Sequence, residues 1–284
     1  MPRANLALAV IGDEIGPSLD EMIEFARSEK VSRLDMRTVA GRNLLGMEPA
    51  EIDAIAGRLR AAGIAVPTFV SPLLKWTAPG RGTSAGKVDF AFDPAQCPAP
   101  DPFAYAVEVA ERLGARRLRI FSYLRYPEYR PDDLAEPIGR LTALAERHDL
   151  TLELENEPVC NVGTIAELRA FFDRFDHPRL RPLVDICNAW SMGERPTADD
   201  LARLAPRADQ IHLKDRDVAA RRTVALGEGD MPWATDLAHL LDRVSAPEVL
   251  ASIETHVPAE PRAATTRSVA ALRRLAREIG VTLS

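Results

Sequence analysis

Short apolar runs alternate with longer amphipathic segments along almost the whole chain. The apolar runs have the length and composition of strands, and they predict eight strands, at residues 5–11, 32–37, 64–70, 116–122, 150–155, 181–185, 209–213 and 248–254. Segments with a helical spacing of apolar residues follow them, at residues 18–30, 48–62, 101–113, 131–148, 164–175, 197–205, 232–244 and 260–279. Eight strand–helix units in succession are typical of a (β/α)8 TIM barrel, an α/β fold.

Local signals support these boundaries. Ser18 and Glu21 have the spacing of a capping box, and Gly63 and Gly114 follow segments of helical periodicity. Pro137 predicts a kink or a break within residues 131–148. Residues 71–100 are too long for an ordinary connection and form a candidate active-site loop after the third strand. A doubly wound sheet is the competing fold, but residues 11–16 lack its glycine pattern, so we expect residues 1–284 to form one barrel domain.

Carboxylates and a histidine stand at or near the carboxyl ends of four predicted strands. Side chains alternate along a strand, so Leu152 and Leu154 share the face opposite Glu153 and Glu155. If the apolar face meets the helices, the glutamates point into the barrel. The same parity points Arg37, Arg119, Asp185, His212 and Glu254 inward. We therefore expect Glu155, Asp185, His212 and Glu254 to converge at one end of the barrel.

Three carboxylates and one imidazole form a ligand set that suits one divalent ion, with Mn²⁺ or Mg²⁺ favoured and Co²⁺ or Zn²⁺ also compatible. Such an ion can polarise a carbonyl and stabilise the enediolate that forms when a neighbouring carbon loses its proton. Glu155 and Glu254, on distant strands, can then address opposite faces of that carbon as acid and base. This arrangement favours epimerisation or isomerisation of a sugar. Each residue also has an ordinary interpretation: Glu155 as a surface carboxylate after a strand, Asp185 as a turn cap, His212 as a core histidine and Glu254 as the partner of an arginine.

Composition excludes several other classes of protein. The net charge of −6 and the absence of a long apolar run argue against general binding to nucleic acid or to membranes. Three cysteines without C-x-x-C spacing argue against a disulfide framework or a structural zinc site and fit a reducing cytoplasm.

Arg119 is expected to neutralise Glu153 deeper in the barrel, because an unpaired buried carboxylate is costly.

Several segments resemble the xylose isomerase-like TIM barrel superfamily, the sugar phosphate isomerase and epimerase group. The resemblance rests on Leu154-Glu-Asn156, Val184-Asp-Ile-Cys-Asn188, Ile211-His-Leu-Lys-Asp215 and Ile253-Glu254, and it extends to 34–43, 71–75, 119–122 and 226–233. It implies that Glu155, Asp185, His212 and Glu254 bind the metal and that the two glutamates form the acid–base pair. Members of that group often carry His where this chain has Asn188.

Further polar residues near the strand ends are candidates for catalysis or for contact with a substrate. Lys214 shares the inward parity of His212 and is a candidate catalytic group. Candidate substrate contacts are Arg37, Asn43, Lys75, Arg119, Asn188, Asp215, Arg216 and His256. Asp215 can instead orient Lys214 or a neighbouring loop, and Arg216, Arg221 and Arg222 can bind a phosphate or form a solvated loop. Trp76, Trp190 and Trp233 can form an aromatic wall for a sugar or pack in loops.

The sequence leaves the reaction and the substrate open. A lyase or dehydratase acting on a keto-polyol or keto-glycoside uses the same metal chemistry, and a barrel that binds a ligand without catalysis is a third hypothesis. A nuclease for abasic sites is the weakest hypothesis, because five histidines are too few for several metal ions. By analogy with the superfamily, we expect a small polyol or sugar as the ligand and a homodimer or homotetramer as the assembly.

Overall fold

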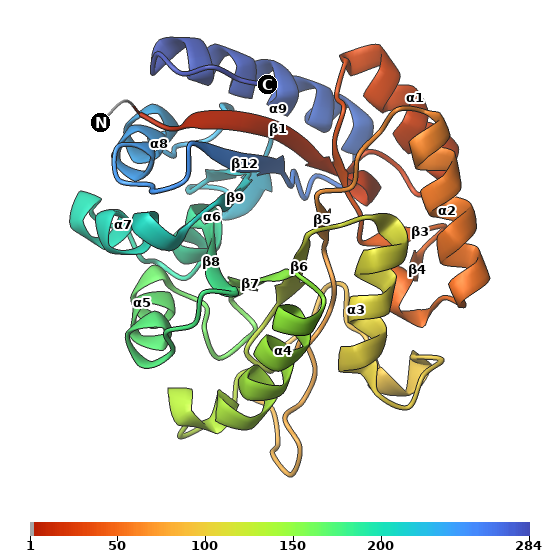
Figure 1. Ribbon diagram of the computed structural model, residues 1–284. Coiled ribbons are helices and arrows are strands. Elements are labelled where there is room, and N and C mark those ends of the chain that lie inside the picture. Colours follow the sequence, from red (N-terminus) through yellow and green to blue (C-terminus); the bar gives the residue numbers. More distant parts are fainter. Residues whose placement is uncertain (1–2) are drawn as a thin grey trace.

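The computed structural model, which describes residues 3–284, confirms the predicted barrel (Figure 1). Residues 1–2 of the predicted domain lie outside the described residues. Eight parallel strands form one sheet in the order β2-β1-β12-β9-β8-β7-β6-β5. The strands are β1 (Asn5–Ile11), β2 (Leu34–Asp35), β5 (Thr68–Phe69), β6 (Arg117–Ile120), β7 (Thr151–Glu155), β8 (Leu180–Asp185), β9 (Gln210–Leu213) and β12 (Glu248–Ile253).

The predicted helices surround this sheet in Figure 1. They are α1 (Leu19–Glu29), α2 (Pro49–Ala61), α3 (Pro102–Leu113), α4 (Ala135–Arg147), α5 (Ile165–Arg174), α7 (Ala198–Leu204), α8 (Trp233–Leu241) and α9 (Pro261–Glu278). Sequence periodicity did not predict the short helix α6 (Ile186–Ser191), or the two hairpins β3 (Thr38–Val39) with β4 (Arg42–Asn43) and β10 (Asp215–Asp217) with β11 (Arg222–Val224). These pieces are too short to show a period.

Capping residues set the helix ends as the sequence indicates. The backbone N–H of Glu21 donates to Ser18 Oγ over 3.2 Å, and the Ser18 N–H donates to Glu21 Oε2 over 2.9 Å, which is the predicted capping box. Gly114 ends α3 with φ of 77°, a left-handed conformation in which glycine carries no Cβ strain. The predicted segment 131–148 divides before Pro137, into a 3-10 turn at Pro131–Leu134 and α4, and Pro137 lies in the first turn of α4.

The barrel is nearly closed between its two shortest strands. β2 and β5 each span two residues, shorter than predicted, and isolated parallel bridges Arg33–Ala65 and Met36–Phe69 connect their flanks. The Met36 N–H donates to the Thr68 carbonyl oxygen over 3.1 Å, and the Val70 N–H donates to the Met36 carbonyl oxygen over 2.9 Å. The neighbouring strands β1 and β12 pair from Asn5–Glu248 to Val10–Ile253, so the barrel wall is continuous beside this junction.

The strand parity predicted from sequence is confirmed by burial. Leu152, Leu154, Val184, Ile211 and Ile253 are 0–2% exposed and belong to the apolar core between the sheet and the helices. Polar side chains fill the barrel interior instead. One layer below the candidate site, Ser252 Oγ donates to Asp35 Oδ2 over 2.6 Å and Gln210 Nε2 donates to Ser252 Oγ over 3.0 Å, so these buried polar groups satisfy one another.

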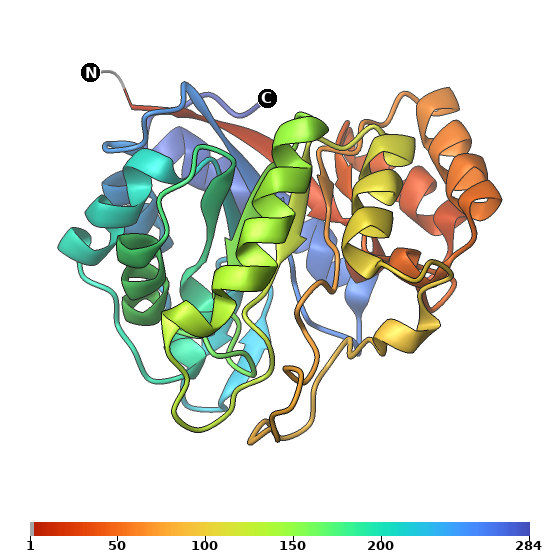
Figure 2. The same ribbon diagram turned by 60° about the horizontal axis from the view of Figure 1, so that its bottom comes forward.

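The connection between β5 and α3 is the longest loop of the barrel. Figure 2 shows it extending well beyond the helices that surround the sheet. It contains the one-turn helix η3 (Pro94–Gln96), and Phe90 is one of its exposed apolar residues. Within residues 3–284, none of the helices combines the length and the apolar character that a membrane span requires.

Candidate metal centre

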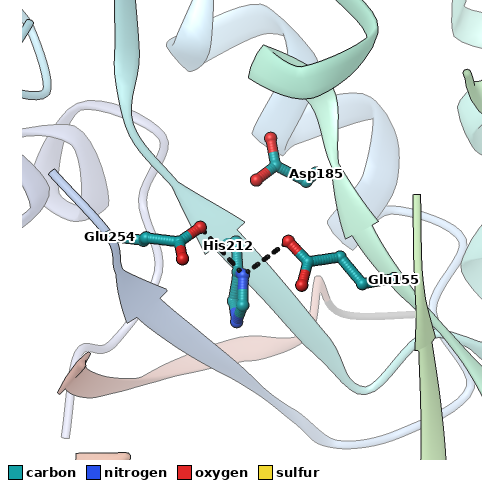
Figure 3. Close-up of side chains that lie close together, drawn as sticks. All are labelled: Glu155, Asp185, His212 and Glu254. Atoms are coloured by element: carbon teal, nitrogen blue, oxygen red, sulfur yellow. Dashed lines mark hydrogen bonds and ion pairs between the residues drawn. The ribbon is translucent and has the colours of Figure 1, made fainter. Parts of the chain in front are cut away.

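Four strands bring the predicted ligand residues together (Figure 3). Glu155 and Asp185 are the last residues of β7 and β8, His212 lies in β9, and Glu254 directly follows β12. Each offers one oxygen or nitrogen atom to a group whose atoms all lie within 4.8 Å of one another. The His212 Nδ1 atom lies between the glutamates, 3.1 Å from Glu155 Oε1 and 3.3 Å from Glu254 Oε2. The geometry therefore supports the convergence that strand parity predicts.

Burial and mutual charge perturb every member of this group. Burial alone would raise the pKa of Glu155, but the positive charges of His212 and Arg119 outweigh it and lower the pKa to about 2. The pKa of Glu254 is held well below its usual value in the same way, by Lys214 and the two neighbouring histidines. Burial opposes protonation of His212, yet the two glutamates raise its pKa to about 10. Both glutamates are therefore ionised at neutral pH.

Lys214 lies inside the ligand group. Its Nζ is 2.5 Å from Asp185 Oδ2 and 2.7 Å from Glu254 Oε2, and its side chain is 3% exposed. Burial favours the neutral amine, but the two carboxylates raise the pKa of Lys214 well above its usual value. The predicted catalytic lysine thus touches two of the four candidate ligands as an ammonium ion.

Two inward arginines hold the glutamates, one each. Arg119 Nη1 donates to Glu155 Oε2 over 2.9 Å, and Arg37 Nη1 donates to Glu254 Oε1 over 2.9 Å. The other oxygen of each glutamate faces His212. Each carboxylate is therefore fixed at one oxygen and directed into the site with the other.

The prediction that Arg119 neutralises Glu153 is wrong. The two residues pair in register on β6 and β7, but the arginine side chain extends one layer toward the carboxyl end and reaches Glu155. The closest cation to Glu153 is Arg117, whose Nε lies 3.4 Å from Oε1. Burial and the negative charge of Asp209 raise the pKa of Glu153 well above its usual value. Glu153, which lies deeper in the barrel than Glu155, is therefore favoured in its protonated, uncharged form.

Two acidic residues that sequence reasoning passed over complete the site. Asp13 and Glu14 follow β1, and both accept hydrogen bonds from Arg37, at 2.9 Å and 2.6 Å. His256 Nε2 lies 3.3 Å from Glu14 Oε1 and 3.2 Å from Glu254 Oε1. The rule that found the other ligands, polar residues at the carboxyl end of a strand, applies equally to Asp13 and Glu14.

The net charge of this cluster suits one divalent cation. Its carboxylates are Asp13, Glu14, Glu155, Asp185 and Glu254, and its permanently charged cations are Arg37, Arg119 and Lys214. Five negative charges against three positive ones leave two, which protons on His212 and His256, both of raised pKa, balance in the absence of an ion. A divalent ion bound by the oxygen and nitrogen ligands would balance them with both histidines neutral, so the residues present fit such an ion.

The remaining predicted contacts lie around this cluster. Among them, Asn188 is nearest to the candidate ligands. Its Nδ2 donates to the Asn156 carbonyl oxygen over 2.8 Å and lies 3.5 Å from Glu155 Oε1. Its N–H donates to Asp185 Oδ1 over 2.8 Å, so Asp185 caps α6 with one oxygen and faces Lys214 with the other. Lys75 is buried and pairs with Glu157 over 3.1 Å.

Other predicted contacts are engaged elsewhere. Asn43 Oδ1 accepts from the Leu45 N–H over 3.0 Å at the rim of the barrel. Asp215 accepts from the Gly227 and Met231 N–H groups over 2.9 Å and 3.2 Å, so it organises the following loop, one of the two roles that the sequence allowed. Arg216 is half-buried on the hairpin β10–β11, whereas Arg221 and Arg222 are exposed.

The three tryptophans do not share one wall. Trp233 is 3% exposed, and its indole donates to the Lys214 carbonyl oxygen over 3.0 Å, which fixes the backbone beside the candidate ligands. The Trp190 ring packs against the Arg195 guanidinium, with 3.8 Å from Cζ to the ring centroid. Trp76 is half-buried on the long loop. Loop packing, the alternative to a sugar-facing wall, describes Trp190 and Trp233.

The fold and the site together define a TIM barrel with a buried carboxylate–histidine cluster suited to a divalent metal. The chain belongs to the xylose isomerase-like TIM barrel family, which it matches over residues 28–275. Among curated proteins it is similar to fructoselysine 3-epimerase of Shigella flexneri, with 25% identity over 201 residues, 67% of this chain and 71% of that protein.

Solved structures share the whole fold at low sequence identity. A xylose isomerase domain protein from Planctomyces limnophilus superposes with a TM-score of 0.69 at 18% identity, covering 98% of this chain and 99% of the other. The IOLI protein, solved with a zinc atom, superposes with a TM-score of 0.69 at 13% identity, covering 96% and 97%. These likenesses establish the fold of the barrel.

Proposed function

We propose that this protein is a divalent-metal-dependent epimerase or isomerase of a sugar with a carbonyl group. The observation that carries the proposal is the matched pair of glutamates, each held by an arginine at one oxygen and facing His212 with the other. The epimerase relative supports the proposed reaction, and the zinc-containing structural neighbour supports the proposed metal site. We favour Mn²⁺ or Mg²⁺ because oxygen ligands dominate the site.

A divalent ion at these four ligands would polarise the substrate carbonyl and stabilise negative charge that develops on its oxygen. Glu155, ionised at neutral pH, would take a proton from the carbon next to that carbonyl. Glu254 would deliver a proton to the other face; Lys214 Nζ, 2.7 Å from its Oε2, would supply that proton and become a neutral amine. Exchange with solvent then removes the proton from Glu155 and returns one to Lys214.

The low exposure of the cluster serves this chemistry. Glu155, Asp185, His212 and Glu254 are 0–2% exposed, so water is largely excluded from the groups that hold and move the proton. Electrostatic interactions are stronger in such a site than in water. Arg37 and Arg119 keep the two glutamates oriented without closing the face directed toward His212.

The test is deuterium exchange. The Mn²⁺-loaded protein is incubated with a panel of ketoses in deuterated water, and incorporation at the carbon next to the carbonyl is followed by NMR and mass spectrometry. We expect incorporation with at least one ketose, and a loss of about 10²-fold or more in Glu155→Gln and Glu254→Gln, the usual contribution of a positioned acid or base. Loss of water from the product would instead identify the lyase reaction.

Glu228→Gln is the matched control, because Glu228 is a half-exposed partner of Arg267 outside the site. Elemental analysis of the wild type and of His212→Ala accompanies the kinetics, and about one ion per chain is expected in the wild type, with loss in the variant. Full exchange in both glutamine variants, or an ion retained by His212→Ala, would refute the proposed site.

A further inference from the structure

Asp185 lies beyond the part of β8 that pairs with β7. The register of the two strands ends with Glu155 opposite Leu183, two residues before Asp185. Figure 3 shows the carboxylates of Glu155 and Asp185 at the ends of these neighbouring strands. Asp185 is 0% exposed, and a buried N–H or carbonyl group without a partner is costly. The position of this candidate ligand therefore depends on what its backbone meets beyond the strand pairing.

The Asn156 side chain supplies partners for both backbone groups. Its Oδ1 accepts from the Asp185 N–H over 2.9 Å, and its Nδ2 donates to the Asp185 carbonyl oxygen over 2.8 Å. Nδ2 also donates to the Gly163 carbonyl oxygen over 3.3 Å. An asparagine amide carries a donor and an acceptor side by side, as a peptide group does, so it can pair with both backbone groups of one residue. Asn156 thus extends the pairing of β7 with β8 by means of its side chain.

Asn188 joins the same set of contacts. Its Nδ2 donates to the Asn156 carbonyl oxygen over 2.8 Å, and its N–H donates to Asp185 Oδ1 over 2.8 Å. The other oxygen, Asp185 Oδ2, lies 2.5 Å from Lys214 Nζ. Asp185 is therefore held at its backbone and at one carboxylate oxygen, with the second oxygen directed into the site. The two glutamates of the site are likewise held at one oxygen, by arginines.

We propose that Asn156 is a positioning residue of the metal centre, which fixes Asp185 and Glu155 relative to each other in the geometry that a divalent ion requires. This inference rests on the proposed function, because it assigns a role toward the ion of that site. Asn156 directly follows Glu155 in the chain and binds the Asp185 backbone, so one residue links two candidate ligands from neighbouring strands. Its side chain is buried and engaged at both ends of the amide, so it acts through the ligands and not on a substrate.

Calorimetric titration of the metal-free protein with Mn²⁺ tests this role without requiring turnover. In Asn156→Ala the Asp185 N–H and carbonyl oxygen lose their partners. We expect the dissociation constant for Mn²⁺ to rise about 10- to 100-fold, the usual effect of losing a group that orients a metal ligand. The visible absorption spectrum of the Co²⁺-loaded protein should change as well, because it depends on the arrangement of the ligands around the ion.

Asn161→Ala is the matched control. Asn161 is 2% exposed, and its amide also pairs with backbone groups, the Ser122 carbonyl oxygen over 2.7 Å and the Tyr126 N–H over 3.1 Å. These groups belong to the segment after β6 and not to the candidate ligands. Both variants should unfold at a lower temperature than the wild type, by a similar amount. Asn161→Ala should nevertheless keep the wild-type affinity for Mn²⁺ and the wild-type Co²⁺ spectrum.

Asn188→Ala is a second variant that tests the proposal if Asn156→Ala does not fold. It removes the Nδ2 contact with Asn156 and keeps the N–H contact with Asp185, so a smaller rise in the dissociation constant is expected. In the double variant the two effects should not add, because both residues hold the same ligand.

Four outcomes would be decisive. Wild-type affinity for Mn²⁺ in Asn156→Ala, or in Asn188→Ala where the first variant does not fold, would overturn the positioning role and leave the proposed reaction intact. An equal loss of affinity in Asn161→Ala would assign the effect to general destabilisation and overturn the role as well. A wild type that binds no Mn²⁺ would refute the proposed site together with this inference. Weaker binding in Asn156→Ala alone, without deuterium exchange on any ketose, would retain the positioning role and refute the proposed reaction.

Discussion

Lys214 shows how one residue can hold a cluster of candidate metal ligands together. Its ammonium contacts Asp185 and Glu254, two of the four candidate ligands, and compensates part of their charge. A divalent ion at the same ligands would take over that compensation. The lysine and the ion are therefore alternatives for part of the same negative charge.

Replacing Lys214 should make the fold depend on metal. In Lys214→Met, two buried carboxylates lose their partner, and we expect the metal-free protein to lose about 3 kcal/mol of unfolding free energy, as in other broken buried ion pairs. Mn²⁺ should restore more stability to this variant than it adds to the wild type. Urea unfolding with chelator and with Mn²⁺ measures both quantities.

Lys75→Met is the comparison for this experiment. Lys75 is also buried and paired with one carboxylate, Glu157, but that carboxylate is not a candidate ligand. The stability that the Lys75→Met variant loses should be the same with and without Mn²⁺. If Mn²⁺ restores both variants equally, Lys214 does not share the charge of the ion site.

At the scale of elements, the site depends on the short segment after each strand. α6 begins directly after β8 because Asp185 caps it, and the same residue presents its second oxygen to the site. The hairpin β10–β11 comes directly after β9 and is held by Asp215. Short connections of this kind fix the ends of the strands and, with them, the ligand side chains.

Helix α8 carries an ionisable residue that opposes folding at neutral pH. Asp236 is 8% exposed, and burial raises its pKa to about 6 from the usual 3.8. A carboxyl with a raised pKa binds its proton more tightly in the folded protein, so its contribution to stability decreases as the pH rises from 3.8 through 6. Asp236→Asn should therefore stabilise the protein by about 2 kcal/mol at pH 8.

The same substitution should have little effect near pH 3, where Asp236 is protonated in both states. Urea unfolding at the two pH values provides the measurement, and Asp242→Asn is the control, because its partner Arg3 lowers the pKa of Asp242 instead. A gain for Asp236→Asn that does not depend on pH would assign its effect to side-chain packing and not to ionisation.

At the scale of the whole molecule, the candidate ligands connect distant parts of the chain. They come from β7, β8, β9 and the end of β12, which are neighbours in the sheet although Glu155 and Glu254 are far apart in the sequence. An ion bound to all four would link this half of the barrel. It would bind the folded state and not the unfolded chain, so stability should rise with its concentration.

Mn²⁺ at one hundred times its dissociation constant should stabilise the fold by about 2.7 kcal/mol, which corresponds to a rise in Tm of about 5 °C or more for a chain of this size. Thermal unfolding with Mn²⁺ and with chelator measures the shift. His212→Ala should abolish it, whereas His148→Ala, which changes a half-exposed histidine paired with Glu111, should keep it. A shift that persists in His212→Ala would place the stabilising ion elsewhere.

The sequence by itself determined the barrel and the four candidate ligands. Both follow from local rules: the alternation of strand and helix signals, and the period of two that turns Leu152 and Leu154 outward and Glu155 inward. The carboxyl ends of parallel strands meet at one end of a barrel, so residues far apart in the chain can be grouped without knowing the structure. Asp13 and Glu14 were accessible to the same rule.

Only the tertiary structure decided how these side chains are paired and covered. Arg119 reaches Glu155 and not Glu153, because the length and direction of its side chain set the contact, whereas parity specifies only the face. Phe90 lies over Arg37 because a loop with no sequence period packs across the end of the barrel. Such contacts depend on long-range packing, so the candidate ligands were predictable from the chain, while their electrostatic partners and the loop residue that covers Arg37 were not.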